Sequence, residues 1–315
     1  MSDVSGHPLA DSALLTLELP ALAGDSEQEN FTVLSPLLAR DLRPHFAAVY
    51  DYCRLIDDLA DNQGVGEAAR MRALALLGLA RNELRLAFAG ASKHPVFVRL
   101  SRTVIEKQLP IAPFEDLLGA FEQDQRVMRY ETYERLLDYC TRSANPVGRI
   151  VLMLDGYSPE LSPELFLLSD RICTALQLTN FWQDVRRDLL ERDRIYLPRV
   201  DFGHGEEELR SWMNRGNDPE ARVEYILSLR KLVERTDLLF AEGEELVRRL
   251  DRRLGPVVYL FHRGGRETLR LILRTGCTTL WQRPALSKFQ KLDLIARAFV
   301  LRSIGRWRRE RSEPR

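Results

Sequence analysis

Tyr50-Asp-Tyr-Cys-Arg54-Leu-Ile-Asp57-Asp58-Leu-Ala-Asp61 is a charged segment within a region rich in Leu and Ala. Tyr50, Arg54, Asp57 and Asp61 follow one another at steps of four, three and four residues. At about 3.6 residues per turn they share one face of a helix, and apolar residues occupy that face on the two preceding turns. Charges on a core-facing stripe are costly unless they are paired or bind a metal ion. The segment therefore predicts a helix that points polar groups into the interior.

A second segment, Gln177-Leu-Thr-Asn180-Phe-Trp-Gln-Asp184-Val-Arg-Arg-Asp188, repeats this pattern. Its polar residues are spaced by three, four and four, and most positions between them are apolar, so this helix is predicted to be buried. Side chains four residues apart lie about 5–6 Å from each other at Cβ. Two such helices facing each other predict a cavity lined by carboxylates.

The chemistry of these side chains predicts a magnesium site. Mg²⁺ binds through one or two carboxylates and shares its remaining positions with water and substrate phosphates. Arg192-Asp-Arg194-Ile-Tyr196 follows the second segment, and its arginines could hold diphosphate oxygens through paired N–H donors. The predicted metal ligands are Asp57, Asp58, Asp61, Asn180, Asp184 and Asp188.

Two other interpretations of the acidic segments remain open. Each segment alone is compatible with a solvated acidic helix face. Together they are also compatible with a non-catalytic helical scaffold that binds structural cations. Loss of a motif aspartate would favour the scaffold, and none is lost in this sequence.

The overall composition excludes several classes of protein. The 315 residues carry zero net charge and are 45% hydrophobic, which favours a large core and gives no support to nucleic-acid binding. The four cysteines are far apart, as in a cytoplasmic protein with reduced thiols. We find no signal peptide and no membrane-spanning run. No GxGxxG or Walker A motif supports a Rossmann-type nucleotide site, and we expect no nicotinamide cofactor.

Helical periodicity extends over most of the chain, and no alternating strand pattern interrupts it. We predict an all-α single domain of eight to ten helices. It is divided into a loose lead-in over 1–27, a helical domain over 28–300 and a basic tail over 301–315. Beyond the first motif helix, helices are predicted at 67–89, 96–108, 114–128, 132–154, 163–191, 219–251, 256–276 and 287–309.

The C-terminal segment 288–315 is strongly basic. It has nine Lys and Arg residues against three acidic ones, a net charge of +6, and apolar residues interleave with these charges. Such a helix could rest on the anionic inner face of a membrane as a peripheral contact. It could equally be a terminal helix that docks on the core with a basic outer face.

The two motifs resemble those of the squalene/phytoene synthase family. The family's first motif has Tyr, Arg and DDxxD, matched here by Tyr50, Arg54 and Asp57–Asp61; its second motif, QxxNxxxDxxxD, matches from Gln177 to Asp188. The resemblance covers roughly residues 28–300. It implies an isoprenoid synthase fold, a single helical bundle around a central cavity that holds isoprenoid chains, and Mg²⁺-assisted loss of diphosphate.

Within that family, three segments are similar to the branch of bacterial hydroxysqualene synthases, which act on presqualene diphosphate. They are Glu29-Asn-Phe31, Arg142-Ser-Ala-Asn-Pro-Val-Gly148 and Asn180-Phe-Trp-Gln-Asp184. The sequence departs from the wider family where Gln28 and Asn30 replace serines and where Gln183 replaces an arginine. The loop that follows Asp188 is also one residue longer. These departures fit an enzyme that ionises one diphosphate rather than condensing two substrates.

The resemblance implies Mg²⁺-dependent conversion of presqualene diphosphate to hydroxysqualene, a step of hopanoid biosynthesis. The alternative is a squalene, dehydrosqualene or phytoene synthase that uses farnesyl diphosphate or a longer homologue. Aromatic faces such as Phe31 and Tyr50 would favour nearby positive charge by about 0.5–2 kcal/mol each. We predict Tyr50, Arg54, Phe31, Asn145 and Gln183 as catalytic, the two amides standing near the water that captures the cation. The predicted substrate-binding residues are Arg54, Gln177, Asn180, Arg194 and Tyr196.

Overall fold

The computed structural model describes residues 19–20, 35–216 and 218–303. Within these ranges the chain forms helices and no β-strand, apart from one isolated bridge between Arg129 and Ile195. The all-α prediction is therefore confirmed. The elements are η1 (Ser35–Leu37), α2 (Arg43–Asp61), α3 (Glu67–Phe88), α4 (Pro95–Glu106), α5 (Ala112–Asp124), α6 (Tyr133–Ser143), α7 (Asn145–Leu154), α8 (Pro163–Gln183), α9 (Val185–Glu191), α10 (Arg199–Phe202), α11 (Glu206–Asn214), α12 (Pro219–Arg249), α13 (Gly255–Arg274) and α14 (Lys288–Ser303).

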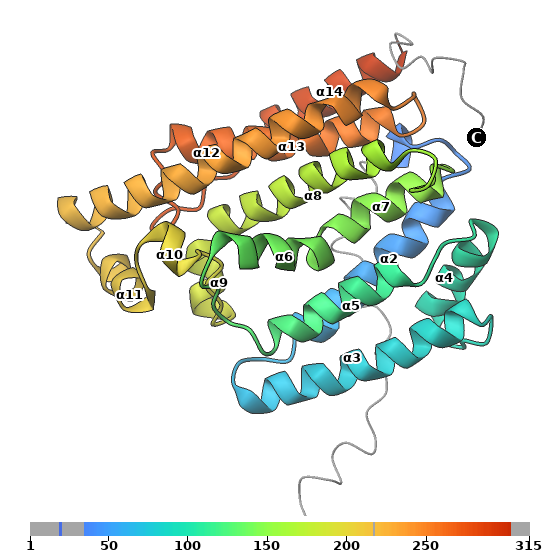
Figure 1. Cartoon of the computed structure of the whole chain (residues 1–315), viewed down its shortest axis with the longest axis horizontal. Helices are drawn as coiled ribbons and strands as arrows, with labels where there is room; N and C mark the ends of the chain where they lie inside the picture. Colours follow the sequence, from blue (N-terminus) through green and yellow to red (C-terminus); the bar gives the residue numbers. More distant parts are fainter. Residues whose placement is uncertain (1–18, 21–34, 217, 304–315) are drawn as a thin grey trace, which may run out of the picture.

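The helices form layers around α8 (Figure 1). On one side α8 packs against α12 and α13, and α14 packs on α13. On the other side it packs against α7 and α6, which lead to α5 and then to α2, α3 and α4. The two motif helices, α2 and α8, thus lie in different layers with α5, α6 and α7 between them.

Close helix packing holds α8 in this central position. At Gly148 in α7, a Cβ atom would overlap the side chains of Ser169 and Cys173 in α8. At Gly243 in α12, it would lie 2.5 Å from Cγ1 of Ile172 and 3.3 Å from its backbone nitrogen. Only glycine permits such an approach of two helix backbones. As the sequence predicts, most of α8 is buried.

The predicted helix at 132–154 is in fact two helices, α6 and α7, separated at Ala144 (φ −128°, ψ −49°). The cause is Pro146, which has no N–H to donate to the preceding turn and whose ring clashes with the carbonyl four residues earlier. Proline is tolerated in the first turn of a helix, so α7 begins beside it. This break makes Ser143 the last residue of α6.

The predicted helix at 163–191 is also two helices, α8 and α9, which meet at Asp184 (φ −105°, ψ 15°). No proline or glycine requires this break. Instead, the loop after α13 holds both residues at the junction: Gln183 donates to the carbonyl of Pro284, and Asp184 accepts from Arg283. Tertiary contacts of this kind override local helix propensity.

Two short helices were not predicted. They are α10 and α11, which lie between the second motif and α12. Glu206, Glu207 and Glu208 begin α11, and acidic residues in a first turn favour a helix N-terminus, so the sequence does contain a signal for α11.

Some predictions fall outside the described residues. Only 19–20 of the lead-in and 301–303 of the tail are described, so the domain boundaries stay predictions. Across the described ranges, no helix combines the length and the apolar character that crossing a bilayer requires.

Candidate active site

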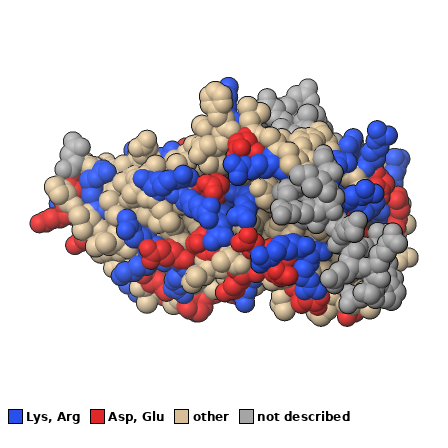
Figure 2. Space-filling model, turned by 90° about the horizontal axis from the view of Figure 1, so that it is seen from above, with Lys and Arg blue, Asp and Glu red and all other residues tan. Residues whose placement is uncertain are grey.

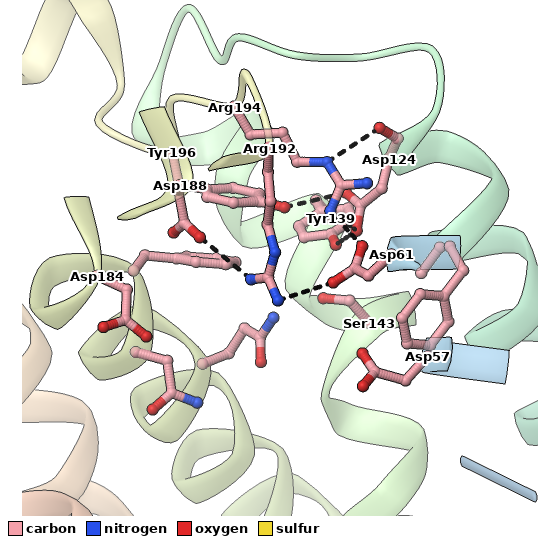
Figure 3. Close-up of a pocket in the computed structure, with 15 residues that line it drawn as sticks. Asp57, Asp61, Asp124, Tyr139, Ser143, Asp184, Asp188, Arg192, Arg194 and Tyr196 are labelled. Atoms are coloured by element: carbon pink, nitrogen blue, oxygen red, sulfur yellow. Dashed lines mark hydrogen bonds and ion pairs between the residues drawn. The ribbon is translucent and has the colours of Figure 1, made fainter. Parts of the chain in front are cut away.

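A cavity of about 360 Å³ lies where the C-terminal ends of α2, α5, α6 and α8 meet the loop after α9. It brings together residues from both acidic motifs, which are more than a hundred positions apart in the sequence (Figure 3). The predicted site residues that line it are Asp57, Asp61, Gln177, Asn180, Asp184, Asp188, Arg194 and Tyr196.

Three predicted residues of the first motif are not in this lining. Arg54 is half-buried on α2, and its guanidinium contacts Asp57 at 3.0 Å and Asp58 at 2.7 Å. Asp58 also accepts from Asn62 at 2.9 Å. Tyr50 is half-buried one turn before Arg54. Arg54 is therefore placed to hold the acidic pair in position, and Phe31 lies outside the described residues.

Asn145 and Gln183, the two amides predicted to stand near the capturing water, do not line the cavity either. Asn145 is buried, and its Oδ1 accepts from the Thr174 hydroxyl at 2.9 Å. Gln183 is buried, and its Nε2 donates to the Pro284 carbonyl at 2.5 Å. Both amides thus make structural hydrogen bonds between elements.

Arg192 links the two acidic motifs across the cavity (Figure 3). Its Nη2 contacts Asp61 Oδ2 at 2.8 Å, and its Nη1 contacts Asp188 Oδ1 at 3.2 Å. A cation therefore already joins carboxylates from α2 and α9. The predicted site residues included Arg194 but not Arg192.

Arg194 has a more enclosed environment. Its Nη1 contacts Asp61 Oδ1 at 3.0 Å, and its Nε donates to the backbone carbonyl of Asp124 at 3.2 Å. The Asp124 carboxylate lies 3.8 Å from the same guanidinium and accepts from the hydroxyls of Tyr139 (2.8 Å) and Tyr196 (3.3 Å). All five of these side chains are largely buried, so the arrangement is a closed polar network.

The loop that carries both arginines is held by Asp193, which lies between them. Asp193 has a positive φ of 53°, a conformation that costs energy for a residue with a Cβ. Its carboxylate contacts Arg70 at 2.7 Å and Arg129 at 2.9 Å. Downstream, the Ile195 N–H donates to the Met128 carbonyl at 2.9 Å. These contacts fix a strained turn whose flanking arginines line the cavity.

Aromatic rings form one wall of the site. Phe181 and Tyr196 stack with ring centroids 3.8 Å apart and planes within 9°. Tyr139 stacks beside them, 6.0 Å from Tyr196 and 6.2 Å from Phe181. Such faces attract positive charge.

Burial raises the pKa of three carboxylates here. Desolvation, reinforced by Asp61, raises the pKa of Asp57 to about 6. Desolvation raises the pKa of Asp188 to about 7 although Arg192 opposes it, and that of Asp124 to about 6 although Arg194 opposes it. A divalent cation would relieve the cost of holding these groups ionised.

The donors fit Mg²⁺ chemically, since carboxylate and amide oxygens from both motifs line a single cavity. Within the described ranges, no three His, Cys, Asp or Glu side chains form a ready-made metal cluster. We therefore expect the ligands to come from both motifs and from the substrate's phosphates. Asp57, Asp61, Asn180, Asp184 and Asp188 are the residues that would hold the ion.

The apparent Mg²⁺ affinity of the protein should rise with pH. A metal ligand must be deprotonated, so protons on Asp57 (pKa about 6) and Asp188 (pKa about 7) compete with the ion at low pH. Between pH 6 and pH 8 we expect about a 20-fold increase, from the protonated fractions that these pKa values imply. Isothermal titration calorimetry in buffers of different ionisation enthalpy measures both the affinity and the protons released. A pH-independent affinity without proton release would contradict the assignment of these two ligands.

Sequence reasoning missed Asp124 and Tyr139, and it named Arg192 only as a possible diphosphate donor, outside the predicted site residues. A signal for Asp124 existed: Leu117, Phe121 and Asp124 are spaced by four and three residues, so the carboxylate continues an apolar helix face. No comparable pattern marks Tyr139, because it is one aromatic among many on a buried face.

Comparisons with known proteins agree with this geometry. The squalene/phytoene synthase family model matches residues 25–290. A hydroxysqualene synthase of Zymomonas mobilis is 39% identical over 175 residues, 55% of this chain and 55% of that protein, so the match spans about half of that relative. A phytoene synthase of Mycobacterium tuberculosis is 30% identical over 272 residues, 86% of each protein.

A solved structure is also similar. The crystal structure of squalene synthase HpnC from Alicyclobacillus acidocaldarius matches with a TM-score of 0.70 at 40% identity, over 80% of this chain and 90% of that one. The predicted isoprenoid synthase fold is thereby confirmed. Enzymes of the matched family act on prenyl diphosphates and use a divalent metal to ionise them. With its family match, its fold and its two acidic motifs, this chain belongs to the squalene/phytoene synthase family.

Proposed function

We propose that this protein is a hydroxysqualene synthase, which ionises presqualene diphosphate with Mg²⁺ and captures the rearranged cation with water. The products would be hydroxysqualene and diphosphate, for use in squalene or hopanoid synthesis. The observation that carries the proposal is a single cavity that combines carboxylates and arginines with uncharged polar groups and an aromatic wall. The similarity to the Zymomonas enzyme supports the same branch.

The charged side chains of the cavity would bind the diphosphate. Arg192 and Arg194 present N–H donors there, and phosphate oxygens would compete with Asp61 for both guanidinium groups. Bound Mg²⁺ would offset the negative charge of the leaving diphosphate. Arg54 would keep Asp57 oriented through their 3.0 Å contact. Each of these groups favours departure of the diphosphate over its return.

The apolar and aromatic part of the lining would protect the cation. Ala120 and Phe121 exclude water there, and the stacked rings of Phe181 and Tyr196 offer π-faces to positive charge. Because bulk water would quench a carbocation unselectively, these walls are needed for any defined product.

The test is product analysis with purified full-length protein, presqualene diphosphate and Mg²⁺, with and without NADPH. We expect hydroxysqualene and diphosphate in both arms, with equal rates. Squalene that forms only when NADPH is supplied would overturn the proposal, because hydride rather than water would then end the reaction.

A second candidate is phytoene synthesis, which the match over 86% of the Mycobacterium enzyme favours. It requires condensation of two geranylgeranyl diphosphates. Offering farnesyl, geranylgeranyl and presqualene diphosphate in parallel distinguishes the candidates, because only the third should be consumed by a hydroxysqualene synthase.

We also propose that the protein binds the anionic membrane surface through α14. This helix packs inward through Leu294 and Ala298, while Phe289 and Leu292 are 84% and 60% exposed. Phe299 and Val300 continue the exposed stripe, since Phe289, Leu292, Phe299 and Val300 fall on one helix face.

Charged side chains border this apolar stripe. Lys288 lies at one edge and Asp293, which pairs with Arg297 at 2.8 Å, lies at the other, and residues 304–315, outside the described part, add five arginines against two acidic residues. Over the face that carries α12–α14, basic and acidic groups are intermixed rather than separated (Figure 2). Attraction to lipid therefore depends on the apolar stripe together with the basic C-terminus.

Replacing both Phe289 and Leu292 by serine should weaken binding to phosphatidylglycerol-containing vesicles by about tenfold or more, because two apolar side chains lose their insertion. Vesicle co-sedimentation measures this. The matched control is Leu167→Ser, which changes a 65% exposed leucine on α8. Wild-type binding should also fall as salt is raised. Absent or salt-insensitive binding would contradict the proposal, as would self-association that accounts for the sedimentation.

A further inference from the structure

We propose that Ser143 holds the water molecule that captures the cation, which makes the product an alcohol; this inference rests on the proposed function. Ser143 ends α6 and lines the cavity, and its hydroxyl points into it (Figure 3). The Oγ atom is buried and has no hydrogen-bond partner among the residues that the structure describes. A buried hydroxyl without a partner is costly, so it calls for a ligand.

The alternatives for holding this water are already engaged. Asn145 accepts from Thr174, and Gln183 donates to Pro284, each away from the cavity. In the branch-like segment from Arg142 to Gly148, Ser143 is thus the residue whose polar group reaches the site. The helix break that Pro146 causes places it at the end of α6, one turn after Tyr139 on the same face.

The surroundings of the hydroxyl suit a single bound water. A buried water needs two to four polar partners, and besides Ser143 the side-chain amide of Gln177, which is not among the proposed metal ligands, lines the same cavity. A hydroxyl can both donate and accept a hydrogen bond. It can therefore orient a water molecule while one lone pair of the water oxygen stays free to attack the cation. It is uncharged, so it does not compete with the arginines for the diphosphate. Ala120 and Phe121 in the same lining limit access by further water.

The chemical step is simple. After the diphosphate has left with the electron pair of its C–O bond and the cation has rearranged, the lone pair of the water oxygen forms a new C–O bond. The resulting oxonium loses one proton, and the departed diphosphate accepts it. Ser143 positions the water throughout and is itself unchanged.

The decisive variant is Ser143→Ala, assayed with presqualene diphosphate and Mg²⁺. We expect the rate of diphosphate release to stay within about threefold of wild type, because the hydroxyl does not touch the leaving group. The fraction of product that is hydroxysqualene should fall by about fivefold, the effect of one lost hydrogen bond, with olefins from proton loss taking its place. Ser143→Thr retains the hydroxyl and should restore the alcohol fraction.

Stability separates this role from a structural one. Because the Ser143 hydroxyl has no protein partner in the described residues, its removal should leave the melting temperature unchanged or higher. The matched control is Thr141→Ala, which removes a hydroxyl from the exposed face of the same helix. It should keep the wild-type product ratio.

Each result decides between the proposals. A wild-type product ratio in Ser143→Ala would overturn the role of Ser143 while leaving the proposed function intact. Ser143→Ala could instead lose the alcohol and also have a lowered melting temperature, with neither property restored in Ser143→Thr. That result would assign Ser143 a structural role and would likewise overturn its role in holding the water. Wild-type protein that forms no hydroxysqualene would instead overturn the proposed function, and this inference with it.

Discussion

Asp57→Asn and Asp184→Asn should each lower turnover by about a thousandfold, which corresponds to about 4 kcal/mol of transition-state stabilisation. The two residues line the cavity from α2 and from the junction of α8 and α9. An amide keeps the shape of the carboxylate but lacks the negative charge that Mg²⁺ requires. Diphosphate release from presqualene diphosphate measures the loss, and far-UV circular dichroism should show unchanged helix content.

The control is Asp51→Asn on the same helix. Asp51 contacts Arg99 at 2.7 Å, away from the cavity, so its replacement should leave turnover nearly unchanged. Wild-type activity in either cavity variant, or in excess chelator, would contradict the metal assignment.

Arg194→Met should destabilise the protein by about 3 kcal/mol, because it leaves buried carboxylates without their counter-charge. Arg194 is 7% exposed and contacts Asp61 and Asp124, of which Asp124 is equally enclosed. Methionine keeps most of the length of the side chain, so the effect reports the lost charge and hydrogen bonds. Thermal unfolding measures it.

The pH dependence of this effect has a definite sign. Burial raises the pKa of Asp124 to about 6, and Arg194 opposes that rise, so the pKa should be higher still in the variant. Protonation of Asp124 then removes the uncompensated charge, and the destabilisation should shrink as pH falls from 8 to 5. The exposed pair of Arg199 and Glu131 provides the control, since Arg199→Met should change the melting temperature little. A penalty for Arg194→Met that grows toward low pH would contradict this account.

The sequence predicts most of the acidic lining of the candidate site because helical spacing is a local property. Asp57 and Asp61, like Asp184 and Asp188, fall on one face by counting alone, and the apolar residues around them indicate that this face is buried. The same counting would have found Asp124. Counting residues cannot predict the helix break at Asp184, because contacts with Arg283 and Pro284, about a hundred residues away in the sequence, produce that break.

Hydrogen-bond partners were the part that could not be predicted. Asn145 and Ser143 are two residues apart, and both are polar in an apolar region. Asn145 accepts a hydrogen bond from Thr174, whereas the Ser143 hydroxyl has no hydrogen-bond partner among the described residues, and only the tertiary structure distinguishes the two. Similarly, the positive φ of Asp193 follows from its arginine partners on α3 and in the loop after α5.

The central claim is that water, not hydride, ends the reaction, and oxygen labelling tests it most directly. Purified protein is incubated with presqualene diphosphate and Mg²⁺ in ¹⁸O-enriched water without NADPH, and the C₃₀ product is examined by mass spectrometry. The account predicts a single hydroxysqualene that carries one solvent-derived ¹⁸O atom, with one diphosphate released per alcohol formed. An unlabelled hydrocarbon as the main product, or no turnover until NADPH is added, would contradict it.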